Sequence, residues 1–175
     1  MAKRNAMYYA ERDFPVFPCF PNSKKSLTLN EHLDATTDWE LIDYWWSRCP
    51  NANIAIHTQN LVVLDIDVKS GVNGFKTLQK LEKQYGKLPT TRTQKTPSGG
   101  QHRIFKTSNL IVPSLVNCPG EGLDIRARDG YILADPSSID GISYKMNDAR
   151  IEEAPVWLLN HIYAFKDTED KYRYP

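Results

Sequence analysis

Residues 61–68 of this 175-residue chain read LVVLDIDV, an apolar run rich in β-branched residues that two aspartates interrupt. Such a run predicts a β-strand. Because successive side chains of a strand point to opposite faces, Asp65 and Asp67 are expected on one face and the aliphatic residues around them on the other. The strand therefore offers one face to a hydrophobic core and the other to a cation.

Two carboxylates this close repel each other unless a cation lies between them, and oxygen ligands of this kind suit Mg²⁺ or Mn²⁺. A third acid lies in the run LDIR at 123–126, where Asp124 and Arg126 share a strand face. Together with Asp65 and Asp67 it completes the three carboxylates that two-metal phosphoryl-transfer sites commonly use. The same pattern also fits exposed acids paired with Arg126, and Arg126 could instead receive a phosphate.

Further along the chain, residues 96–103 read TPSGGQHR. Paired glycines at 99 and 100 predict a turn whose backbone amides can approach an anion closely. His102 begins the apolar strand that follows, so it is a candidate donor to a triphosphate. An ordinary half-buried histidine is the alternative interpretation.

Helices and strands alternate around these segments, which favours a mixed α+β domain. A capping box from Thr37 to Glu40 predicts the start of the second helix, residues 58–60 predict a hairpin turn, and Gly86 predicts the end of the third helix. The expected helices are 2–12, 38–48, 75–85 and 155–165, and the expected strands are 14–18, 53–57, 61–68, 90–93, 101–106, 110–116, 122–126 and 131–134. Residues 166–175 are charged and unpatterned, so we expect one domain at 1–165 followed by a polar tail or linker.

Charge is balanced overall, with 22 Lys and Arg against 21 Asp and Glu, a net charge of +1. This balance argues against a protein that coats nucleic acid through bulk positive charge. The stretch between Glu82 and Glu121 nevertheless contains no acid and carries six basic residues: Lys83, Lys87, Arg92, Lys95, Arg103 and Lys106. A solvated surface would explain them, as would a groove for a polyanion next to the acids.

Cysteine usage and hydropathy exclude other classes. Cys19, Cys49 and Cys118 are widely spaced, which indicates small buried or half-buried residues rather than a disulfide framework or a zinc site. No stretch approaches the roughly 18 apolar residues of a membrane span, and no signal-type run follows the first residues. We therefore expect a cytoplasmic protein with no membrane partner.

The ordered motifs resemble the bifunctional primase-polymerase domain of the archaeo-eukaryotic primase superfamily across nearly all of residues 5–165. The resemblance lies in ATTD at 35–38, WW at 45–46, NANIAI at 51–56, VLDID at 63–67, TPSGGQH at 96–102, GLDIR at 122–126, GYILADPS at 130–137 and APVWL at 154–158. It implies a catalytic core with a sheet like that of an RNA-recognition motif, joined to a smaller N-terminal α/β unit.

The resemblance also implies roles for single residues. The Asp-x-Asp motif falls on Asp65 and Asp67 and the third acid on Asp124, and these would bind two Mg²⁺ or Mn²⁺ ions. A small residue-x-His motif falls on Gly100 and His102, which would contact the phosphates of an NTP or dNTP. The family's serine is replaced here by Gly100, so a backbone amide or Ser98 would substitute for it.

Departing pyrophosphate would meet His102 or Arg103, with Arg126 as a further candidate for the nucleotide. The candidate contacts to a single-stranded DNA template and primer are five basic residues: Lys24, Lys25, Lys87, Arg92 and Lys95.

The expected function is a template-dependent nucleotidyltransferase, a DNA primase and polymerase, acting in replication of a plasmid, phage or mobile element, or in repair. A metal-dependent nuclease could use the same acids, and a non-catalytic module that binds single-stranded nucleic acid could keep the same sheet. The chain contains no GxxxxGK[ST] loop, so a helicase would be a separate domain or chain.

Overall fold

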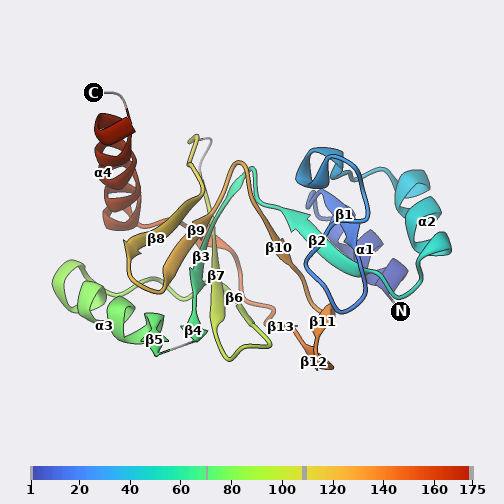
Figure 1. Cartoon of the computed structure of the whole chain (residues 1–175), viewed down its shortest axis with the longest axis horizontal. Coiled ribbons are helices and arrows are strands. Elements are labelled where there is room, and N and C mark those ends of the chain that lie inside the picture. Colours follow the sequence, from blue (N-terminus) through green and yellow to red (C-terminus); the bar gives the residue numbers. More distant parts are fainter. Residues whose placement is uncertain (1, 70, 108–109, 174–175) are drawn as a thin grey trace. The chain divides into compact units, whose positions relative to one another are not determined.

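The structure is a computed structural model that describes residues 2–69, 71–107 and 110–173. Helices and a large antiparallel sheet combine in it as an α+β fold, as the sequence predicts (Figure 1). The chain divides into two compact units, and each is assembled from two separate stretches. The first unit contains Met1–His57 and Gly130–Met146, and the second contains Thr58–Asp129 and Asn147–Pro175.

The first unit is built on an antiparallel sheet in the order β1-β2-β10. Its core gathers Phe17, Cys19, Ala55, Leu133 and Tyr144. Its elements are α1 (Ala2–Ala10), β1 (Val16–Cys19), η1 (Glu31–Asp34), α2 (Trp39–Arg48), β2 (Asn53–His57), β10 (Tyr131–Leu133), β11 (Ser138–Ile139), β12 (Ile142–Ser143) and β13 (Lys145–Met146).

The second unit is built on a sheet in the order β6-β7-β3-β9-β8, in which neighbouring strands are antiparallel and β14 pairs in parallel with β7. Its elements are β3 (Leu61–Ile66), β4 (Val68–Lys69), β5 (Val72–Asn73), α3 (Gly74–Tyr85), β6 (Arg92–Lys95), β7 (Gln101–Lys106), β8 (Leu115–Gly120), β9 (Leu123–Arg126), β14 (Glu152–Glu153) and α4 (Val156–Arg173).

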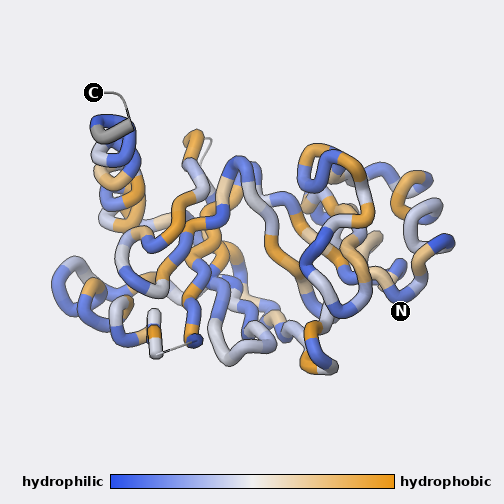
Figure 2. Tube along the Cα trace, viewed as in Figure 1, coloured by the Kyte–Doolittle hydropathy of each residue, from blue (hydrophilic) through white to orange (hydrophobic). Residues whose placement is uncertain are grey.

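The strand that carries the two aspartates lies in the middle of this sheet because its apolar face is needed there. Leu64 and Ile66 of β3 are fully buried and join one core cluster with Leu78 of α3 and with Leu158 and Ile162 of α4. The predicted alternation of β3 is therefore confirmed. Figure 2 shows hydrophobic residues alternating with hydrophilic ones along α4, as expected for a helix with one buried side.

Two predicted connections are wrong. Residues 58–60 do not close a hairpin, because β2 pairs with β1 and β10 while β3 pairs with β7 and β9. The turn at 128–130 likewise joins β9 and β10, which belong to different sheets. Both connections lead from one unit to the other, and apolar patterning within a strand carries no information about its partner.

Two helix ends also differ from prediction. Asp38, and not Thr37, caps α2, because its side chain accepts hydrogen bonds from the backbone N–H groups of Glu40 and Leu41. Helix α4 continues to Arg173, well past the expected end at 165. Its later turns are charged, and an i,i+4 ion pair between Lys166 and Asp170 supports them.

Candidate active site

Four polar side chains lie side by side across four neighbouring strands of the second unit. Gln94 of β6 is opposite His102 of β7, His102 is opposite Asp65 of β3, and Asp65 is opposite Asp124 of β9. Directly opposed residues of antiparallel strands share a face, so all four lie on the side of the sheet away from the Leu64 core. We call Gln94, His102, Asp65 and Asp124 the polar row.

The polar row is mostly buried. The side chains of His102, Asp65 and Asp124 are 6%, 14% and 11% exposed, and Gln94 is fully buried. His102 Nε2 lies 3.4 Å from Asp65 Oδ1, and His102 Nδ1 lies 3.0 Å from Gln94 Nε2. A ligand that reaches this row therefore meets groups whose electrostatic interactions are only weakly screened by water.

Asp65 and Asp124 are like charges directly opposite each other, an arrangement that destabilises a sheet when nothing offsets it. Arg126, two residues along β9 on the same face, supplies the counter-charge. Its Nη2 donates to Asp124 Oδ2 at 2.7 Å, and its Nε lies 3.9 Å from Asp65 Oδ2. The backbone N–H of Asn117 donates to Asp124 Oδ1 at 2.9 Å. Arg126 thus pairs with both acids of the row.

Asp67 follows β3 directly, and its backbone is held by two glycines. Its N–H donates to the Gly122 carbonyl, and its own carbonyl accepts from the Gly74 N–H at 2.8 Å. A Cβ at Gly74 would lie 2.2 Å from the Gly122 oxygen, so only glycine permits this approach. The close backbone packing fixes where Asp67 leaves the strand.

A lysine balances Asp67. Lys69 Nζ donates to Asp67 Oδ2 at 2.8 Å. This hydrogen bond raises the pKa of Lys69 above its ordinary value, and the charges of Asp124 and Asp65 act in the same direction. All three predicted acids therefore act on a single ammonium group.

The donor chemistry of these acids fits a divalent ion, because carboxylate oxygens are the ligands that Mg²⁺ and Mn²⁺ prefer. Within residues 2–69, 71–107 and 110–173, no three His, Cys, Asp or Glu side chains are already grouped to hold an ion. Arg126 and Lys69 instead occupy carboxylate oxygens. The acids are thus gathered around two basic side chains.

The turn before His102 explains the missing serine. A Cβ at Gly100 would lie 2.3 Å from the Ile66 carbonyl oxygen, so a serine there would collide with the backbone of β3. Gly99 adopts a φ of +86°, and its N–H donates to the Thr96 carbonyl. The exposed Ser98 hydroxyl lies 3.1 Å from Thr96 Oγ1. The turn therefore presents backbone and Ser98 where the family motif has a serine.

Arg103 does not join the polar row. It lies opposite Leu64 in the β7–β3 register, which directs it to the core side of the sheet. There its Nη1 lies 3.2 Å from Glu82 Oε1 of α3. The structure therefore separates Arg103 from His102, although they are adjacent in sequence, because alternate residues of a strand face opposite ways.

The predicted basic groove is also divided. The Arg92 Nε donates to the Ala149 carbonyl, and Lys95 is exposed at the end of β6. Lys24 and Lys25 are exposed in the first unit. These four residues do not form one cluster with Lys87.

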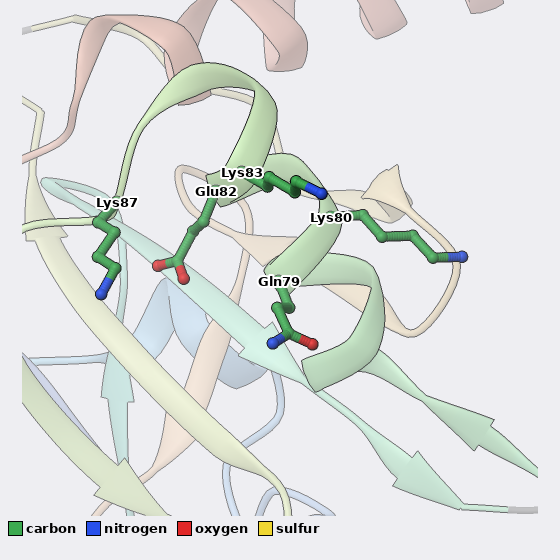
Figure 3. A pocket seen from close by; sticks show the side chains of 5 residues that line it. All are labelled: Gln79, Lys80, Glu82, Lys83 and Lys87. Carbon is green, nitrogen blue, oxygen red and sulfur yellow. The ribbon is translucent and has the colours of Figure 1, made fainter.

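Lys87 instead borders a hollow of about 520 Å³ beside α3 (Figure 3), which Gln79, Lys80, Glu82, Lys83 and Lys87 line. Figure 3 shows Lys80 and Lys83 extending from α3 in the same direction. The one acid of the group, Glu82, is engaged by Arg103 and by the Leu88 N–H. Within the described residues no carboxylate forms an ion pair with these lysines, so the hollow is basic.

Two of the residues that organise the polar row, Gln94 and Lys69, were not singled out from the sequence. Gln94 becomes visible only through the pairing of β6 with β7, which no local pattern gives. Lys69 follows the acid motif directly, and its charge two residues after Asp67 was the available signal.

Comparison with known proteins gives the family. No helix in the described part of the chain is long and apolar enough to span a membrane. A search of curated proteins finds no match. The family model for the bifunctional DNA primase/polymerase N-terminal domain, Prim-Pol, matches residues 6–157. Because this match covers most of the chain, the protein belongs to the Prim-Pol family.

Proposed function

We propose that this domain is a template-dependent nucleotidyltransferase that makes primers or extends DNA on a single-stranded template at the polar row. Family membership supports a primase/polymerase-type nucleotidyltransferase in general. The observation that carries the finer proposal is the register that brings Asp65, Asp124 and His102 together on one face of the sheet, next to Asp67.

Asp65, Asp67 and Asp124 would hold divalent metal, with Lys69 giving up its contact with Asp67. Bound Mg²⁺ or Mn²⁺ would supply a Lewis acid for the α-phosphate and lower the cost of forming an alkoxide from the primer hydroxyl. The chain's own contribution is to gather the carboxylates on a rigid sheet, so that little reorganisation is needed during reaction.

The neighbouring residues would position the nucleotide. His102 offers an N–H edge beside Asp65, and Arg126 offers a guanidinium whose side chain is 36% exposed. Backbone N–H groups of the turn at 96–100 add neutral donors for phosphate oxygens. These donors lie on the face of the sheet where the acids lie, which allows one nucleotide to reach both.

The basic hollow beside α3 would receive polynucleotide phosphates. Lys76, Lys80 and Lys83 are spaced to lie on one side of α3, and all three are exposed. Replacing Lys80 and Lys83 together by Gln is expected to lower the salt dependence of single-stranded DNA binding by about one unit of slope. An unchanged slope, equal to that of the exposed α4 control Lys171→Gln, would remove the hollow from the proposal.

The central experiment is primer extension on a single-stranded template with Mg²⁺ and then Mn²⁺. Asp65→Asn and Asp124→Asn keep the side-chain shape and are expected to abolish extension, while the exposed control Asp129→Asn retains it. Circular dichroism confirms that each variant is folded. Full activity in either row variant would contradict the assignment.

The same assay separates the other interpretations of these acids. Shortening of a labelled primer with metal, and no lengthening when nucleotides are added, would identify a nuclease. Tight binding of single-stranded DNA with no affinity for nucleotide or metal would identify a non-catalytic binding module.

A further inference from the structure

Gln94 is the one member of the polar row that carries no charge, and it is fully buried. Its side-chain Nε2 lies 3.0 Å from Nδ1 of His102, the residue opposite it in the β6–β7 register. A buried amide of this kind costs free energy unless it is hydrogen-bonded, so the contact must be satisfied in the folded state.

The contact fixes where the imidazole proton lies. An amide nitrogen only donates, so Nδ1 of His102 accepts and the ring proton is on Nε2. The other side of the ring requires the same arrangement, because Nε2 faces the Asp65 carboxylate oxygen at 3.4 Å and a carboxylate only accepts. With the proton on Nδ1 alone, two lone pairs would face each other at Asp65.

We propose that Gln94 is a positioning residue that holds His102 as a neutral imidazole with its proton on Nε2. The N–H edge then points along the row toward the acids, where the phosphates of the incoming nucleotide would lie. The assignment of the proton depends on the protein alone, whereas its use by a nucleotide rests on the proposed function. Arg126 and Lys69 offset the nearby carboxylates.

The chemistry of the side chain explains why glutamine suits this position. Glutamate would accept from Nδ1 and draw a proton onto it. Methionine matches the length of glutamine but forms no comparable hydrogen bond. Gln94→Met therefore removes the donor, and Gln94→Glu reverses its polarity.

The test is nitrogen-15 NMR of the metal-free protein, with histidine labelled and His102→Phe used to assign the ring. At about pH 8, above the ordinary histidine pKa of about 6.5, the wild-type ring is expected to carry its proton on Nε2 only. Gln94→Met should move the Nδ1 signal and introduce the second tautomer, and Gln94→Glu should protonate Nδ1. The control Gln101→Met, next to His102 but on the other face, should leave the ring unchanged.

A wild-type ring protonated on Nδ1, whether alone or together with Nε2, would overturn the proposal. An Nδ1 signal unmoved by Gln94→Met would also overturn it, and this variant keeps the test decisive if Gln94→Glu fails to fold.

Affinity for a non-hydrolysable nucleotide then tests the functional part. Gln94→Met is expected to weaken binding about fivefold, within the range for one hydrogen bond, and to have no further effect in the His102→Phe background. Equal weakening in both backgrounds would refute a role through His102. If the wild-type chain extends no primer while Nδ1 stays unprotonated, the proposed function fails and the proton assignment holds.

Discussion

Replacing Arg126 by Met removes the guanidinium that pairs with both opposed acids of the polar row. At the 2.7 Å separation of Nη2 and Asp124 Oδ2, the direct Coulomb attraction is about 6 kcal/mol at an effective dielectric constant of about 20. Arg126 is 36% exposed, so solvent screening and the fixing of a long side chain reduce the net contribution to about 2 kcal/mol. For a chain of this size, that loss lowers Tm by about 4–8 °C.

The same variant should respond more strongly to divalent metal. Once Arg126 is gone, Asp65 and Asp124 repel each other with less compensation, so an ion that binds both relieves a larger strain. An ion present at about 100 times its Kd adds roughly 2.7 kcal/mol of stability, enough to offset the loss. We therefore expect Mn²⁺ to raise the Tm of Arg126→Met by more than it raises that of the wild type.

Thermal unfolding followed by circular dichroism, in chelator and in MnCl₂ at constant ionic strength, measures both effects. The matched control is Arg150→Met, because Arg150 is 81% exposed and lies 3.8 Å from Glu152 in an ordinary surface pair. That control should change the free energy of unfolding by less than about 1 kcal/mol and show no added metal response. A Tm in chelator equal to the wild type, or an equal metal response in both proteins, would refute the reasoning.

Three further outcomes follow from single contacts. Lys69→Met should tighten Mn²⁺ binding several-fold in calorimetry, since the ion no longer competes with an ammonium; weaker binding would contradict this. Gly100→Ser should cost about 2–3 kcal/mol in urea unfolding, because its Cβ meets the backbone of β3 at 2.3 Å. Burial raises the pKa of Cys19 and Cys118 to about 12, so at about pH 8 a thiol reagent should label Cys49 first, and stability should fall above about pH 9, where only unfolded thiols ionise.

Local patterns predicted the elements that position the site. The alternation in residues 61–68 gave β3 its core face and its acid face, and the run from Gln101 to Lys106 is β7 within the predicted limits. Helix α3 ends where predicted, with Gly86 at a φ of +102°. Each of these features depends on neighbours in sequence, which is why the sequence alone carried them.

Pairing between distant segments could not be predicted in the same way. The contact between Gln94 and His102 depends on the register of β6 against β7, and the ion pair of Arg103 with Glu82 depends on α3 packing against the core face of the sheet. The acid-free stretch predicted a continuous basic groove, whereas strand alternation and tertiary packing distributed its residues over different surfaces. Charge along the chain does not specify which face each residue occupies.

The division of each unit into two stretches has a consequence for synthesis on the ribosome. The first unit cannot complete its sheet until β10 has emerged, because β2 pairs with both β1 and β10. Before that, residues 58–129 have already emerged, although their own core still lacks Leu158 and Ile162 of α4. Neither unit can therefore finish folding ahead of the other by a wide margin, and a nascent chain stopped near residue 129 would expose the unfinished edges of both.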